Sequence, residues 1–202
     1  MAASTKTTTG PTAKKAEAKS TAKATPKTTA VRRTAAVGVA ATRQERAERG
    51  FIASPQLRAA LQRVHVDLIE LHLQGKQAHW NVVGHNFRDL HLQLDEIVDA
   101  ARAFSDDVAE RLRALHATPD GRSATVAEQT SLPEFPNREV DTAETVDLIT
   151  ERLESVVGTL REVHDEVDEE DPTSADMLHA IIARLEQFAW MVSAENRTPT
   201  RG

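Results

Sequence analysis

The stretch HWNVVGHNFRDLHLQLDEIVDAARAFSDDVAERL, residues 79–112, carries two overlaid patterns. Apolar residues recur every three or four positions, which predicts a long amphipathic helix with one face toward a core. Asn86, followed three residues later by Asp89, predicts where that helix begins. The core-facing positions are Phe87, Leu90, Leu94, Ile97, Ala101, Phe104 and Val108. Histidines and carboxylates lie beside them at helical spacing, so this segment holds both a core face and a candidate site.

Similar apolar patterns predict a helix before this stretch and two helices after it. The preceding helix runs to about residue 82, with its apolar face at Leu57, Leu61, Val64, Leu68 and Leu71. The third helix has its apolar face at Val146, Ile149, Leu153, Val156, Leu160, Val163 and Val167. The fourth follows a break at Asp171-Pro172, with its apolar face at Leu178, Ile181, Leu185, Phe188 and Val192.

Residues 117–140 contain Gly121 and three prolines, which predicts a long connection with a short helix near residues 124–129. No strand pattern is visible. Two helical hairpins joined by one long crossover give an all-α, ferritin-like four-helix bundle. We assign residues 1–50 to a basic, mostly disordered arm, 51–197 to the bundle and 198–202 to a short tail.

The charge of the chain is divided between these parts. Residues 1–50 carry eleven Lys or Arg and three Glu, a net charge of +8, whereas residues 51–202 carry fourteen Lys or Arg and twenty-eight Asp or Glu, a net charge of −14. The chain has no cysteine, so His and carboxylate are the available metal ligands, a set that suits iron, manganese or zinc. No apolar run approaches 18 residues, so we expect no membrane span.

The candidate ligands of the second helix lie along one edge of it. His91 and Asp95 each follow an apolar core position by one residue, about 100° around the helix from the core. Asp106 and Glu110 continue the same edge, because steps of four and eleven residues are both near whole turns. Asp95 and Asp106 are about 16 Å apart along the axis, too far to share one ion. However, the pair His91 and Glu110 and the pair Asp95 and Asp106 have the same midpoint, between residues 100 and 101. A second copy packed antiparallel across a two-fold axis there would face His91 and Asp95 with Glu110 and Asp106, giving two equal sites per dimer.

Two other interpretations of this pattern exist. Charged residues four apart also occur on helix faces that only contact solvent. A di-iron centre inside the bundle would use Glu-x-x-His motifs, but no histidine here has Glu three residues before it, so that interpretation is disfavoured. His79, near the end of the preceding helix, can join the same edge.

Residues 55–196 resemble the Dps family, the DNA-binding proteins from starved cells, which are small relatives of the ferritins. The resemblance rests on KQAHWNVVG (76–84), NFRDLHLQLDE (86–96), DDVAER (106–111) and LEQFAWMVSAE (185–195). It implies a hollow homododecamer that oxidises Fe(II) with H₂O₂ or O₂ and stores Fe(III) oxide. It also implies a two-iron ferroxidase centre at each dimer interface.

By position, the resemblance assigns His79, His91 and Asp95 to one subunit and Asp106 and Glu110 to its partner. These five residues would be both the iron ligands and the catalytic set. Leu92 departs from the family, which often has Glu at this non-ligand position. Trp80 resembles a family tryptophan that takes up stray oxidising equivalents; packing at the end of the bundle is the alternative.

Asp171 and Asp176 lie where the family has three-fold pores through which iron enters. Capping of the fourth helix is the structural alternative, and the two roles are compatible. His65 and His72 precede His79 at steps of seven residues and share its face; they predict either a second metal site or core packing. The remaining histidines have no clear partner at ligand spacing: His85, His116, His164 and His179.

The basic arm predicts sequence-independent DNA binding. Its cations are spread along a segment without aromatic residues, which suits contact with phosphates rather than with bases. They are Lys6, Lys14, Lys15, Lys19, Lys23, Lys27, Arg32 and Arg33. A solubilising tail and a targeting peptide are the alternatives. We therefore expect a cytoplasmic, nucleoid-associated ferroxidase that stores iron and protects DNA; the alternative function is a nucleoid-compacting protein with secondary iron chemistry.

Overall fold

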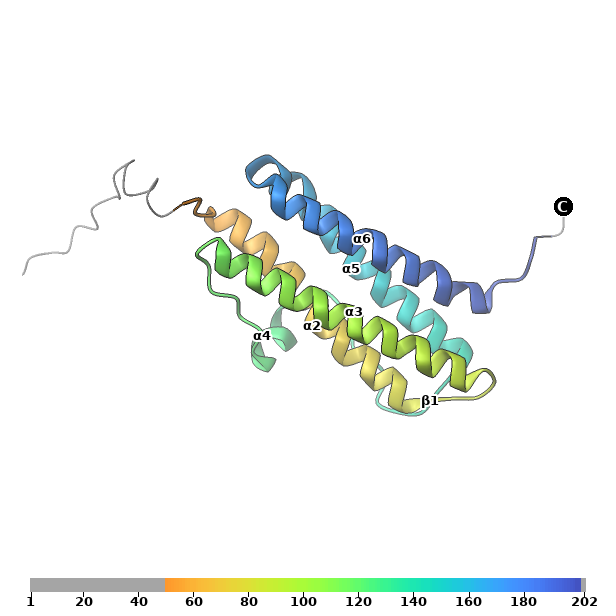
Figure 1. Cartoon of the computed structure of the whole chain (residues 1–202). Helices are drawn as coiled ribbons and strands as arrows, with labels where there is room; N and C mark the ends of the chain where they lie inside the picture. Colours follow the sequence, from red (N-terminus) through yellow and green to blue (C-terminus); the bar gives the residue numbers. More distant parts are fainter. Residues whose placement is uncertain (1–49, 201–202) are drawn as a thin grey trace, which may run out of the picture. The chain divides into compact units, whose positions relative to one another are not determined.

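The computed structural model describes residues 50–200, in which four long helices lie side by side (Figure 1). They are α2 (Pro55–Asn81), α3 (Phe87–Ala114), α5 (Thr142–Glu170) and α6 (Pro172–Ser193). A crossover containing the short helix α4 (Ser123–Gln129) joins the α2–α3 hairpin to the α5–α6 hairpin. A 3₁₀ turn, η1 (Ala194–Asn196), follows α6. The predicted four-helix bundle with one long crossover is confirmed.

The core lies along the apolar faces that the sequence predicted. Every predicted core position of α2, α5 and α6 is buried. In α3, Leu90, Leu94, Ile97, Ala101 and Val108 are buried and Phe104 is partly buried. The assignment of Phe87 to the core was wrong, because its side chain is 42% exposed. Phe87 is the first residue of α3, and its ring instead lies 5.0 Å from the ring of His91.

Two short strands tie the crossover to the end of α2. β1 (Val82–Val83) and β2 (Val140–Asp141) pair in parallel, with Val82 opposite Val140. The expectation of no strand was therefore wrong in this detail, since a ladder of two residues is too short to leave an alternating pattern. The pairing places the start of α5 next to the end of α2.

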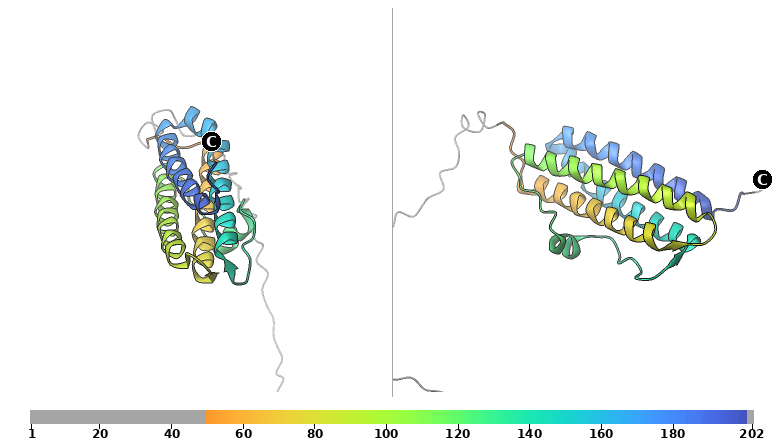
Figure 2. Two further views of the ribbon diagram at one scale, coloured as in Figure 1. Left: turned by 90° about the vertical axis from the view of Figure 1, so that its right-hand side faces the viewer. Right: turned by 60° about the horizontal axis from the view of Figure 1, so that its bottom comes forward.

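Two buried polar networks fix the crossover to the bundle; Figure 2 shows α4 outside the four long helices. The buried carboxylate of Asp67 on α2 accepts hydrogen bonds from the backbone N–H of Ser131 (2.8 Å) and from the hydroxyl of Thr159 on α5 (2.7 Å). The buried guanidinium of Arg152 donates to Gln74 Oε1 (3.0 Å) and to the carbonyl of Glu134 (3.0 Å). Buried charges need such partners, so these two networks specify the path of the crossover.

Candidate metal centre

A close approach of α2 and α3 brings the predicted ligands of both helices together. A Cβ atom built on Gly75 of α2 would lie 2.8 Å from Cγ2 of Val98 on α3, so only glycine allows this spacing. In the antiparallel hairpin, a residue of α2 lies opposite a residue of α3 when their two numbers add up to about 170. His79 therefore lies opposite His91, one helical turn beyond Gly75.

The two histidine rings hold each other in place. They stack with centroids 3.6 Å apart and an angle of 24° between their planes. His79 Nδ1 donates a hydrogen bond to the carbonyl of His91, and His91 Nδ1 donates to the carbonyl of His79, each over 3.0 Å. A carbonyl oxygen can only accept, so each neutral ring carries its proton on Nδ1 and presents a lone pair on Nε2. Imidazoles oriented in this way through their second nitrogen are typical of metal ligands.

Asp95 completes a group of three potential ligands. One ligand atom each from His79, His91 and Asp95 lies within 4.8 Å of the others. His79 is buried, whereas His91 and Asp95 are partly exposed, so the group opens onto the surface of the hairpin. The Asp95 carboxylate lies 3.2 Å from His79 Nδ1.

Lys76 on α2 donates a hydrogen bond to Asp95 and lowers the pKa of that carboxyl, with smaller contributions from the two histidines. Asp95 is therefore ionised at neutral pH, and the ammonium group occupies one of its oxygens where a cation would bind. Lys76 was not among the residues predicted to form the site. A signal was available: Lys76 is the one lysine in residues 51–202.

Asp106 and Glu110 lie outside this cluster within the chain. Both side chains are exposed on α3, more than two turns beyond Asp95. Asp106 instead lines a surface cavity with His65 and His72. Their exposed position on the helix that carries His91 is compatible with contact to a second subunit.

The α2–α3 hairpin also exposes large apolar side chains. Leu73, Trp80, Val83, Phe87 and Leu92 are each between 42% and 71% exposed. Clusters of exposed apolar residues on a protein surface usually mark contacts with a partner. The hairpin that carries the candidate ligands is therefore also a candidate interface.

The chain resembles known proteins over the whole bundle. Residues 58–199 match the family model of the ferritin-like domain. DNA protection during starvation protein 2 of Deinococcus radiodurans is 36% identical over 142 residues, which cover 70% of this chain and 59% of that protein. DNA protection during starvation protein of Brevibacillus brevis is 34% identical over 135 residues, which cover 66% of this chain and 90% of that relative. This chain belongs to the Dps family.

Solved Dps structures share the fold as well. Dps from Microbacterium arborescens, in the high iron form, matches with a TM-score of 0.67 at 32% identity, covering 73% of this chain and 99% of that chain. In this Dps chain, no helix of the described part is both long enough and apolar enough to cross a membrane.

His65 and His72 precede the cluster in the Dps chain, and they are buried and partly buried, respectively. His65 is buried, and its Nδ1 donates to the carbonyl of Ser105 (3.0 Å). Burial lowers the pKa of His65, and it also lowers the pKa of His72, where Arg102 adds to the effect. Both rings are therefore neutral at pH 7. Their predicted second metal site stays a prediction.

The two carboxylates predicted at the Dps pore have different surroundings. Asp171 is buried and accepts a hydrogen bond from Arg111 (2.6 Å) and another from the hydroxyl of Ser174 (2.5 Å). It precedes Pro172 at the start of α6 and fixes this turn to α3. The side chain of Asp176 is 90% exposed. Asp171 is the N-cap residue of α6, but its side chain makes no capping hydrogen bond to a backbone N–H of that helix. Asp176 is accessible to a cation, and the pore role of both residues stays a prediction.

Trp80 follows His79 directly, and its side chain is 71% exposed. Trp80 therefore does not pack into the end of its own bundle. The eight cations predicted to bind DNA, from Lys6 to Arg33, lie outside the described residues.

Proposed function

We propose that this protein is a ferroxidase that oxidises Fe(II) with H₂O₂ or O₂ and stores the Fe(III) product inside a homododecameric cage. The observation that carries the proposal is the convergence of His79, His91 and Asp95 on the surface of the α2–α3 hairpin. Mixed imidazole and carboxylate ligands suit iron, and an accessible site leaves positions for the oxidant.

Each centre is shared between two subunits. His91 with Glu110 and Asp95 with Asp106 have the same midpoint on α3, so a two-fold axis at that point places the carboxylates of one chain opposite the cluster of the other. The exposed apolar side chains of the same hairpin supply the contact surface. A dimer then has two equal centres, each with five protein ligands.

The ligands perform three tasks in the reaction. The Nδ1 hydrogen bonds orient both imidazoles, so that the Nε2 lone pairs face the substrate iron. Fe(II) displaces the Lys76 ammonium from Asp95. The added carboxylates of the partner make the site anionic, which favours Fe(III) over Fe(II). With peroxide, two Fe(II) and one H₂O₂ with two water molecules give two FeOOH and four protons; the O–O bond breaks after a two-electron transfer, so no hydroxyl radical is released.

Storage and DNA protection follow from the same family membership. The D. radiodurans and B. brevis relatives are named for DNA protection during starvation, and the M. arborescens Dps structure is a high iron form. Removal of Fe(II) and peroxide together protects DNA chemically. The basic arm adds sequence-independent contact with DNA phosphates, and Trp80 takes up stray oxidising equivalents beside the centre.

The test is the double substitution Asp106→Ala with Glu110→Ala. The initial rate of peroxide-dependent iron oxidation, followed by absorbance, should fall to that of buffer, while size-exclusion chromatography should show an intact cage, because both side chains are exposed. The matched control is Glu96→Ala with Asp107→Ala, which removes the same charge from two exposed positions of α3 that are not proposed ligands. A double variant that oxidises iron at the wild-type rate would refute the assignment of these ligands.

A further inference from the structure

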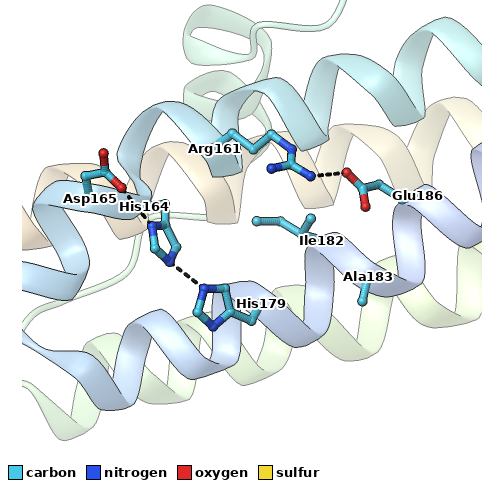
Figure 3. Close-up of a pocket in the computed structure, with 7 residues that line it drawn as sticks. All are labelled: Arg161, His164, Asp165, His179, Ile182, Ala183 and Glu186. Atoms are coloured by element: carbon cyan, nitrogen blue, oxygen red, sulfur yellow. Dashed lines mark hydrogen bonds and ion pairs between the residues drawn. The ribbon is translucent and has the colours of Figure 1, made fainter.

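A surface cavity between α5 and α6 holds two histidines whose rings point at each other (Figure 3). His164 Nε2 and His179 Nε2 are 2.6 Å apart, and the ring centroids are separated by 4.5 Å. The expectation that these histidines lack a partner was therefore wrong. The α5–α6 hairpin turns at Asp171-Pro172, and residues 164 and 179 are equally distant from that turn.

The contact of His164 with Asp165 determines which ring nitrogen of His164 carries the proton and which one carries the lone pair. His164 Nδ1 lies 3.0 Å from Oδ1 of Asp165. An ionised carboxylate can only accept, so Nδ1 donates, and the neutral ring has its lone pair on Nε2. On the other ring, His179 Nδ1 lies 3.8 Å from a carboxylate oxygen of Asp176. The two Nε2 atoms thus face each other with room for one proton between them.

We propose that His164 and His179 bind a divalent first-row transition-metal cation, a second metal site within each subunit. The carboxylates near the outer Nδ1 atoms resemble the carboxylate–histidine–metal arrangement that orients ligating imidazoles. Tetrahedral coordination with metal–nitrogen bonds of ~2.0–2.1 Å needs the two nitrogens about 3.3 Å apart. The pair must therefore open by about 0.7 Å, which the 58% exposed side chain of His179 can accommodate by rotation.

The charges around the pair favour a cation. Asp165 and Asp176 lie beside the two rings. The guanidinium of Arg161 lines the same cavity, but it is paired with Glu186 (Figure 3). Water can fill the remaining coordination positions. Imidazole ligands select a transition-metal ion over Mg²⁺ or Ca²⁺, which prefer oxygen.

This site does not depend on the proposed ferroxidase centre. The candidate centre lies on the α2–α3 hairpin, and the histidine pair lies on the α5–α6 hairpin at the opposite side of the bundle (Figure 1). A bound ion would connect the two helices that flank the turn at Asp171.

The test uses Co²⁺, whose visible absorption reports coordination, and the full chain with His91→Ala and Asp95→Ala so that the other cluster is disabled. Adding His164→Gln and His179→Gln should reduce the bound Co²⁺ by about one ion per subunit relative to this parent. The control His85→Gln, also at an exposed histidine, should leave the amount unchanged. Saturating Co²⁺ should raise the Tm of the parent and not that of the variant lacking the pair.

His179→Gln alone keeps the test valid if the combined variant fails to assemble, because it changes a mostly exposed side chain. It should weaken Co²⁺ binding at least tenfold while the cage elutes unchanged from size-exclusion chromatography. Equal Co²⁺ binding with and without the pair, or no Co²⁺ bound by the parent, would overturn the proposal.

Discussion

Substitution of Gly75 by alanine tests whether the close approach of α2 and α3 builds the candidate centre. The new Cβ would lie 2.8 Å from Cγ2 of Val98. Val98 is fully buried, and its β-branched side chain has one strongly preferred rotamer in a helix, so it cannot turn aside. Overpacking of this kind costs about 1–3 kcal/mol, and the better helix propensity of alanine returns about 1 kcal/mol. We therefore expect a net loss of stability of about 0–2 kcal/mol.

Gly158 on α5 provides the matched control. A Cβ atom there meets nothing within 4 Å, so Gly158→Ala keeps only the gain in helix propensity, about 0.5–1 kcal/mol. The two variants should differ in stability by about 1–3 kcal/mol, which is the contribution of the contact with Val98. Unfolding by denaturant should be measured at one protein concentration, because the stability of an oligomer depends on concentration.

Gly75→Ala should also slow iron oxidation, whereas Gly158→Ala should not. Gly75 is one helical turn before His79, so separating the helices there disturbs the stacked rings and their reciprocal hydrogen bonds. A double-mutant cycle with Val98→Ala isolates the cause, since that change removes the methyl group that the new Cβ meets. If Gly75→Ala is as destabilising in the Val98→Ala background as in the wild type, the steric argument is refuted.

Two further predictions concern the turn before α6 and the arm. Burial alone would raise the pKa of Asp171, but the hydrogen bonds from Ser174 and Arg111 outweigh it, so the net pKa lies below the ordinary value of 3.8. Asp171 should therefore stabilise the fold well above pH 3.8 and lose this effect as the pH falls below that value. Asp171→Asn should lower stability by about 1.5–3 kcal/mol at neutral pH, and its deficit in Tm against wild type should shrink in acid; a deficit that does not change with pH would contradict this. Deletion of residues 1–41 should preserve assembly and iron oxidation but abolish gel retardation of plasmid DNA, and binding by the full chain should fall steeply as salt rises. Equal retardation by the truncated cage would exclude the arm as the binding element.

The fold was predictable because each long helix carries its own apolar stripe. Leu57 to Leu71 on α2 and Val146 to Val167 on α5 repeat at helical spacing over several turns, and Asp171-Pro172 marks the break between the last two helices. Features that involve one or two residues leave no such repeat. The β1–β2 ladder is one example. Asn86 is another: it precedes α3 as predicted, but in a left-handed conformation (φ 58°) and without a side-chain hydrogen bond to the helix.

The candidate site was predictable only where one helix carries the residues. His91 and Asp95 are four residues apart on α3, so their shared edge follows from helix geometry. Contacts between helices depend instead on the register of each hairpin. This register brings Lys76 to Asp95 and His164 to His179, and no local spacing reveals either contact. The distance of each residue from the hairpin turn would have indicated both pairs.

Co-assembly of two inactive variants tests the shared centre most directly. One variant carries His91→Ala and Asp95→Ala, and the other carries Asp106→Ala and Glu110→Ala. In a mixed dimer, one centre combines the intact residues of both chains, and the second centre lacks all four. Equal amounts should therefore recover about a quarter of the wild-type rate of iron oxidation, since random pairing makes half of the dimers mixed.

The measurement is the initial rate of peroxide-dependent iron oxidation by cages assembled from a one-to-one mixture, with each variant alone as the control. Recovery to about a quarter of the wild-type rate is the predicted result, because each centre takes its ligands from two chains. A mixture no faster than its parents would contradict the account, since it would mean that no complete centre forms across the subunit interface.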